Sequence, residues 1–281
     1  MQNKIFLDKI PHFYAQKSIY FSMKKDYILV IDSGVGGLST LAETMSILPA
    51  NYIYFADNKN SPYGSHSNEE ILTLLSSIIN SFLSRNKVSL VVLACNTATT
   101  SCIENLRKIY PSIKFVGTEP AIKLASKTQN NILLVATPLT AKQNRLAEII
   151  NNTKKHVKIM PMPSLARSVD DFLAEKSYFS YTKILKDVYK IVSASKNQDA
   201  IVLGCTHYCF LYDIFRKITN IPIFDGNLGV AKQVKFLSEK LNFATQKYST
   251  VRFEFSNPTN FAKQNYKKIL SQILAKKQRL C

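Results

Sequence analysis

The sequence predicts an α/β fold of two similar lobes, each with a mainly parallel sheet flanked by helices, and an active site in the cleft between them. Three observations lead to this prediction. Short apolar runs alternate with longer segments of helical periodicity along most of the 281 residues. The alternation divides into four strand–helix units followed by four more. A cysteine follows the third strand of each half, Cys95 in the first and Cys205 in the second.

The first half begins with an apolar strand over 27–31 that runs into DSGVGGL, where glycines permit a tight turn into a helix over 39–48. A second strand, 52–56, leads into a polar loop that contains SPYG and then into a helix over 68–86. The third strand is the run LVVL at 90–93, whose lack of alternation is typical of a strand buried on both faces. A helix ending near 110 and a fourth strand over 113–116 complete this half.

The second half repeats the order. We expect strands over 131–136, 157–160, 200–203 and 221–224. The helical segments are 141–151, 165–172, 181–194, 210–219 and 230–242. Parallel strands joined through helices require right-handed crossovers, so each half predicts one parallel sheet.

Composition limits the class of protein. With 46% hydrophobic residues the chain can bury a core, and no apolar run reaches the roughly 18 residues that span a bilayer, so we expect a protein without a membrane segment. The net charge of +18 is spread along the chain, as in a lysine-rich solvated surface, and we expect no nucleic-acid partner. Five widely spaced cysteines fit a reducing cytoplasm better than a disulfide framework. Residues 1–22 lack the apolar core of a signal peptide, and we interpret them as a disordered leader ahead of a true start at Met23.

Cys95 and Cys205 are the candidate catalytic residues. Ligands of open α/β sheets bind beyond the carboxyl ends of the strands, which is where both cysteines lie. Two thiols that face one ligand can take a proton from one side of a carbon and deliver a proton to the other, which is a two-base racemisation. A buried cysteine is more often a small packing residue, but two at matching strand ends favour chemistry.

Nearby side chains can assist these thiols. A free thiol has a pKa of about 8.5 and is mostly protonated at neutral pH, so a thiolate site needs help. His207 follows Cys205 by two residues, and Asp32 ends the strand that we expect to lie beside the Cys95 strand; both could orient a thiol and exchange its proton. The uncharged residues Ser33, Asn96, Thr97 and Thr206 are suited to binding carboxylates. The spacing of Cys205, His207 and Cys209 lacks a paired CxxC arrangement, so we predict no metal.

Four motifs, DSGVGGL at 32–38, SPYG at 61–64, ACNTA at 94–98 and LGCTHY at 203–208, together resemble the glutamate racemase family over residues 25 to about 245. The resemblance implies a cofactor-independent isomerase that interconverts L- and D-glutamate and supplies D-glutamate for peptidoglycan. The cysteine usage leads us to expect a cytoplasmic protein. The LGCTHY motif is closer to glutamate than to aspartate racemases, which tend to carry Glu at the position of His207. We expect a homodimer.

The resemblance also assigns residues. Cys95 and Cys205 would be the proton donor–acceptor pair, with Asp32 and His207 beside them. The residues that would contact or support the glutamate are Asp32, Ser33, Tyr63, Gly64, Asn96, Thr97, Thr137, Thr140, Thr206 and His207. The implied organisation is a first lobe of 23–117 plus 226–260, a second lobe of 118–225, and a basic tail at 261–281.

Two positions depart from the family pattern. The family commonly has Cys where Met162 stands and often Glu where Arg167 stands, an acidic residue that assists proton handling in some members. Arg167 reverses that charge and leaves open what completes the acid–base network on this side.

Three other functions compete with glutamate racemisation. A related racemase acting on aspartate would use the same pair of thiols. A hydrolase using Cys205 and His207 would form a covalent acyl-enzyme and would not need Cys95. A nucleic-acid-binding protein would use the positive charge and show no turnover.

Overall fold

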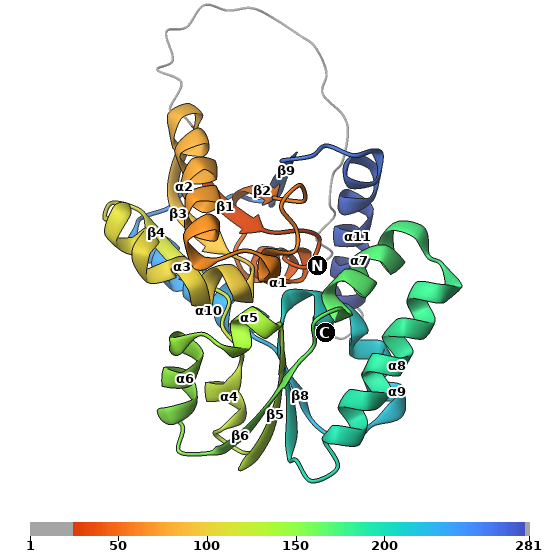
Figure 1. The fold of residues 1–281 in the computed structure, drawn as a ribbon. Helices are drawn as coiled ribbons and strands as arrows, with labels where there is room; N and C mark the ends of the chain where they lie inside the picture. The colour runs from red at the N-terminus through yellow and green to blue at the C-terminus, as the bar shows by residue number, and fades with distance from the viewer. Residues whose placement is uncertain (1–24, 279–281) are drawn as a thin grey trace, which may run out of the picture.

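The computed structural model describes residues 25–278 and forms two lobes, each built on one parallel sheet with helices on both faces (Figure 1). This confirms the fold class expected from the sequence. The proposed leader, the start at Met23 and the last three residues lie outside the described residues. The chain passes from the first lobe to the second after β4 and returns after β8.

The first lobe has a five-stranded parallel sheet in the order β4-β3-β1-β2-β9. Its strands are β1 (Asp26–Asp32), β2 (Asn51–Ala56), β3 (Lys87–Leu93), β4 (Lys114–Gly117) and β9 (Thr250–Phe255). β1 is central because its apolar run is buried on both faces. Its register with β3 pairs Ile31 with Leu93, which brings the carboxyl ends of the two strands together.

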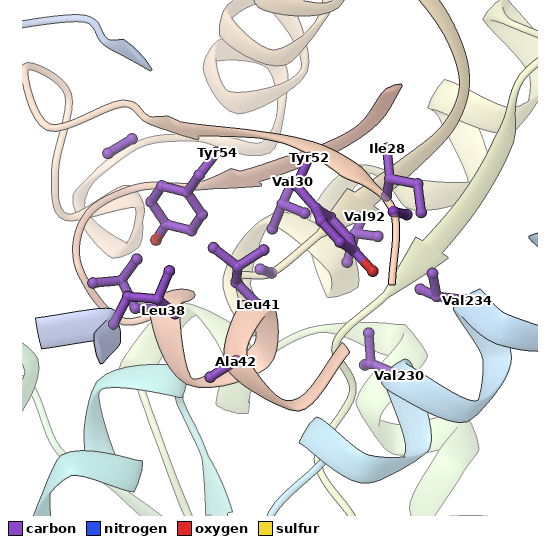
Figure 2. Packing of buried hydrophobic residues seen from close by; sticks show 14 of the residues in the cluster. Ile28, Val30, Leu38, Leu41, Ala42, Tyr52, Tyr54, Val92, Val230 and Val234 are labelled. Carbon is purple, nitrogen blue, oxygen red and sulfur yellow. The ribbon is translucent and has the colours of Figure 1, made fainter. Parts of the chain in front are cut away.

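Helices cover both faces of this sheet. They are α1 (Leu38–Ile47), α2 (Asn68–Arg85), α3 (Asn96–Ile109), α10 (Asn227–Lys240) and α11 (Asn260–Gln278). Side chains alternate along a strand, so Ile28 and Val30 face α1, α10 and α11, whereas Leu29 and Ile31 face α2 and α3. Figure 2 shows the first of these layers, in which residues of β1, β2, α1 and α10 pack together.

The second lobe has a four-stranded parallel sheet in the order β6-β5-β7-β8. Its strands are β5 (Asn131–Ala136), β6 (His156–Pro161), β7 (Ala200–Gly204) and β8 (Ile223–Phe224). Its helices are α4 (Ile122–Ala125), α5 (Pro138–Ala141), α6 (Asn144–Asn151), α7 (Leu165–Glu175), α8 (Tyr178–Ala194) and α9 (Tyr212–Ile218). One face of the sheet packs on α7, α8 and α9, and the other packs on α4 and α6.

Several elements differ from the sequence expectations. β9 and α11 were not predicted. The segment from residue 261, expected only as a basic tail, is part of α11, whose Tyr266 and Leu270 are buried in the core of the first lobe. The expected helix over 141–151 is interrupted at Gln143, whose amide instead bonds Asn68 and Ser101 of the first lobe. The expected helix over 210–219 begins earlier, as the 3₁₀ turn η2 (Thr206–Leu211) that precedes α9.

Candidate active site

Two residues of the first lobe meet because their strands are neighbours. Asp32 ends β1 and Cys95 follows β3, and the Ala94 N–H donates to the Ile31 carbonyl at 2.8 Å. Both side chains are buried, as is the adjacent Ser33. Asp32 was expected to lie next to the Cys95 strand, and the register of β1 with β3 places it there.

The second lobe supplies Cys205, Thr206 and His207 from the end of β7. They meet the first lobe directly: the Thr206 hydroxyl donates to Oδ2 of Asp32 at 3.2 Å. The loop between β1 and α1 fits closely under them. A Cβ atom on Gly36 would collide with the His207 ring and with the Thr206 hydroxyl, so this position requires the absence of a side chain.

Three threonine hydroxyls form a second contact between the lobes. Oγ1 of Thr97, at the start of α3, lies 3.1 Å from Oγ1 of Thr137 and 3.1 Å from that of Thr140. The latter two are themselves 2.9 Å apart. Gly64 approaches the same place, since a Cβ atom there would contact Thr137. Hydroxyls can reorient to donate, so the cluster can bind a carboxylate.

Burial controls protonation on the Cys95 side. Burial, with the nearby Asp32 carboxylate adding to it, raises the pKa of the Cys95 thiol to about 12. Burial also raises the pKa of Asp32 to about 6, against the opposing effect of His207 and of the Gly34 N–H, which donates to Asp32 at 2.7 Å. Cys95 is therefore a thiol at neutral pH, beside a carboxyl group able to exchange protons.

The Cys205 side has a different set of partners. Sγ of Cys205 lies 3.9 Å from Nδ1 of His207, and Nε2 of His207 lies 3.0 Å from Oδ1 of Asp170. Burial alone would lower the pKa of His207, but the Asp170 carboxylate and its hydrogen bond outweigh burial and hold that pKa well above its ordinary value. The imidazole is therefore protonated at neutral pH and supplies a positive charge beside the Cys205 sulfur.

Asp170 was not predicted from the sequence. The presence of Arg167, where the family often has Glu, left open which acidic group serves this side of the site. Asp170 lies one helical turn further along α7, on the same face of the helix, and completes the network. The signal available was the i, i+3 spacing of the two residues.

Two other predicted residues, Tyr63 and Asn96, differ in whether their side chains are free to bind a substrate. The hydroxyl of Tyr63 is buried and donates to Oδ2 of Asp57 at 2.8 Å, so it supports the loop before α2 and is already engaged. By contrast, the buried Nδ2 of Asn96 has no hydrogen-bond partner among the described residues, so it is free to bind a ligand. A buried amide donor without a partner is costly, and a bound carboxylate oxygen would satisfy it.

Both cysteines are nearly inaccessible, with Cys95 7% and Cys205 8% exposed. Within residues 25–278, no group of three or more His, Cys, Asp or Glu side chains is arranged to hold a metal ion. Over the same residues, no helix combines the length and the apolar character needed to cross a membrane. Each of the two thiols has its own acid–base neighbour, Asp32 near Cys95 and His207 beside Cys205.

Known proteins are similar to this chain in sequence and in fold. The chain is 38% identical over 218 residues to a glutamate racemase from Clostridium botulinum, a match covering 75% of this chain and 83% of that protein. The crystal structure of Escherichia coli glutamate racemase, in complex with L-glutamate and the activator UDP-MurNAc-Ala, matches with a TM-score of 0.74 and 26% identity over 89% of this chain and 95% of the other. A glutamate racemase isoform from Bacillus anthracis matches in fold with a TM-score of 0.75 at 24% identity, covering 90% of this chain and 95% of that one.

The family model that describes Asp/Glu/Hydantoin racemases matches residues 35–234, most of the chain and both cysteine-bearing lobes. The match includes Cys95, Cys205 and His207. The chain therefore belongs to the Asp/Glu/Hydantoin racemase family.

Proposed function

We propose that this chain interconverts L- and D-glutamate by proton transfer at the α-carbon, with Cys95 and Cys205 acting from opposite faces. The observation that carries the proposal is the pairing of two strand-end thiols, one from each lobe, each with a separate acid–base group. The similarity to glutamate racemases selects glutamate among the substrates of the family. The D-glutamate produced would supply peptidoglycan synthesis.

The two sides of the site are prepared for opposite tasks. On one side, the His207 imidazolium, held by Asp170, places a positive charge beside the Cys205 sulfur. Cys205 removes the α-proton of one enantiomer. On the other side, the Cys95 thiol is protonated and can deliver its proton to the opposite face of the carbanion. One C–H bond breaks and another forms, and Cys95 is left as the thiolate.

The reverse reaction begins from the Cys95 thiolate. Cys95 is the N-cap residue of α3, so the partial positive charge of the helix N-terminus stabilises that thiolate. Asp32, with a pKa of about 6, can accept or return a proton near neutral pH and so resets the thiol between turnovers. This division of roles gives each enantiomer its own base.

Uncharged donors bind the substrate carboxylates in this proposal. The unpartnered Nδ2 of Asn96 supplies one donor, and the hydroxyls of Thr97, Thr137 and Thr140 supply others. These donors are neutral, so they bind the substrate carboxylates without forming ion pairs with the thiolates.

The test uses protein purified without added metal or pyridoxal phosphate. Each glutamate enantiomer is supplied separately in D₂O, and conversion is followed by circular dichroism while deuterium at the α-carbon is measured by mass spectrometry. We expect both enantiomers to convert to the racemate, with solvent deuterium in the product. An absence of conversion and exchange would refute the proposal; conversion of aspartate in preference to glutamate would refute the choice of substrate.

The chain of contacts from the Cys205 thiol to the His207 imidazole and on to the Asp170 carboxylate is also the arrangement that a cysteine hydrolase uses. That function predicts a covalent acyl-enzyme with an ester or amide substrate and full activity in Cys95→Ser. Racemisation requires Cys95, so this one variant separates the two functions.

We further propose that the protein is a cytoplasmic homodimer. Analytical ultracentrifugation tests the assembly, and a sedimentation coefficient that fits a monomer at micromolar concentration would refute it. Fractionation of the native cells tests the location.

A further inference from the structure

A cavity of about 240 Å³ opens next to the candidate active site, where the two lobes and the C-terminal helix meet. One wall is a single face of α7, formed by Arg167, Asp170, Asp171 and Ala174 at i, i+3, i+4 and i+7. The opposite wall comes from the loops after β1 and β2 and from Tyr266 of α11. Figure 1 shows α7 and α11 side by side at this junction.

The cavity leads to the acid–base network of the site. Gly34 lines its floor, and a Cβ atom built on Gly34 would lie 3.4 Å from Nε2 of His207 and 3.8 Å from Oδ1 of Asp170. A ligand in the cavity would therefore pass the His207–Asp170 pair before reaching the nearly buried sulfurs. This geometry makes the cavity the mouth of the site.

Arg167 is the one basic residue among those that line this mouth. Its side chain is exposed, and it makes no hydrogen bond or ion pair with any described residue. Its position does not help α7, because it lies in the first turn of the helix, where the dipole favours negative charge. Neither the helix dipole nor a close ion pair accounts for the guanidinium.

The charges around Arg167 define what it can do. The Asp170 carboxylate is hydrogen-bonded to His207, and the neighbouring Asp171 adds a second carboxylate to the same wall. Without a cation, this wall would repel an anion. Glutamate carries two carboxylates and one ammonium group and has a net charge of −1, so its approach depends on the sign of the potential at the mouth.

We infer that Arg167 is an anion-receiving residue at the mouth of the site, which attracts a substrate carboxylate and raises the affinity for the anionic amino acid. This inference rests on the proposed function for its substrate. Arg167 acts on binding and takes no part in the proton transfers, since neither Cys95 nor Cys205 is among the residues that line the cavity.

The experiment compares Arg167→Ala, Arg167→Glu and Arg167→Lys with the unaltered protein. The KM and kcat of both glutamate enantiomers are measured at ionic strengths of about 0.02 M and 0.5 M, where the Debye length shortens from about 20 Å to about 4 Å. Lys186→Ala, at an exposed position on α8 away from the cavity, is the control with the same change of net charge.

We expect KM to rise about fivefold in Arg167→Ala and more in Arg167→Glu at low ionic strength, with kcat within about twofold of the unaltered value. Arg167→Lys should restore most of the affinity, and high salt should reduce the differences. An unchanged KM in Arg167→Ala, an equal rise in Lys186→Ala, or a difference that persists at high salt would overturn the inference while leaving racemisation intact.

Failure of the proposed function gives a different result. In that case the unaltered protein racemises neither enantiomer, and the inference is tested by calorimetric binding of glutarate to the unaltered protein and to Arg167→Ala. Weaker binding in Arg167→Ala supports an anion-receiving role, and equal binding, or none to either protein, overturns it.

Discussion

Replacing Asp170 with Asn removes the charge that keeps the His207 imidazole protonated. The carboxylate oxygen lies 3.0 Å from Nε2 of His207, whose side chain is 6% exposed, while that of Asp170 is 33% exposed. Coulomb's law at an effective dielectric constant of about 20 gives about 4 kcal/mol for opposite charges roughly 4 Å apart. Discounting by about half for the exposure of Asp170 leaves about 2 kcal/mol, which corresponds to about a 30-fold change in the ratio of imidazolium to neutral imidazole at a given pH.

The sign of the pH effect follows from the same contact. In the unaltered protein the pKa of His207 is held well above its ordinary value, so the imidazolium persists through neutral pH. In Asp170→Asn, burial remains and acts to lower that pKa, so the positive charge beside Cys205 is lost as the pH rises. We expect kcat/KM to fall about 30-fold at pH 8.5 and by less at pH 6.

The assay is racemisation of each enantiomer, followed by circular dichroism from pH 5.5 to 9.5. Glu175→Gln, an exposed position at the end of α7 with the same change of charge, is the matched control and should follow the unaltered profile. An Asp170→Asn profile that is uniformly lowered, without a shift along the pH axis, would refute the idea that Asp170 acts through the charge of His207.

Three further predictions concern stability, turnover and substrate binding. Burial raises the pKa of Asp32 from 3.8 to about 6, so the stability that this group contributes is fully present below pH 3.8 and is lost as pH rises through about 6; the loss is about 3 kcal/mol. In urea unfolding, Asp32→Asn should therefore gain up to about 3 kcal/mol relative to the unaltered protein between pH 4 and pH 8, while losing activity. Gly36→Ala should displace His207 and lower kcat at least about 100-fold, whereas Gly229→Ala, which meets open space, should not. Asn96→Ala removes a buried donor without a partner, so we expect KM for both enantiomers to rise about tenfold or more with no loss of thermal stability; a lowered Tm with unchanged KM would contradict its binding role.

The sequence was sufficient to predict most of the fold because the central strands of both sheets are buried on both faces. Apolar runs such as 90–93 and 200–203 stand out from the polar segments on either side of them. Their alternation with helical segments predicts two parallel sheets. β9 was missed because it lies at the edge of its sheet and alternates Thr, Arg and Glu with apolar residues, a weaker signal. α11 was missed because its lysines dominate the composition, although Tyr266 and Leu270 anchor it in the core.

The candidate site likewise contains residues that could be predicted from the sequence and residues that could not. Cys95 and Cys205 could be predicted because the carboxyl end of a buried strand is defined by the strand itself. Asp170 could not be predicted because its role depends on how α7 of the second lobe is turned toward His207, and that orientation is set by tertiary packing. The engagement of Tyr63 with Asp57 is also tertiary, since it depends on the path of the loop between β2 and α2.

The central claim is that Cys95 and Cys205 address one α-carbon from opposite faces, and single-thiol variants test it most directly. Cys95→Ser and Cys205→Ser are each incubated in D₂O with L-glutamate and with D-glutamate, and deuterium at the α-carbon is measured by mass spectrometry. We predict that neither variant racemises at an appreciable rate, and that one variant exchanges the α-proton of one enantiomer only while the second exchanges that of the other. Racemisation by either variant, or exchange of the same enantiomer by both, would contradict the account.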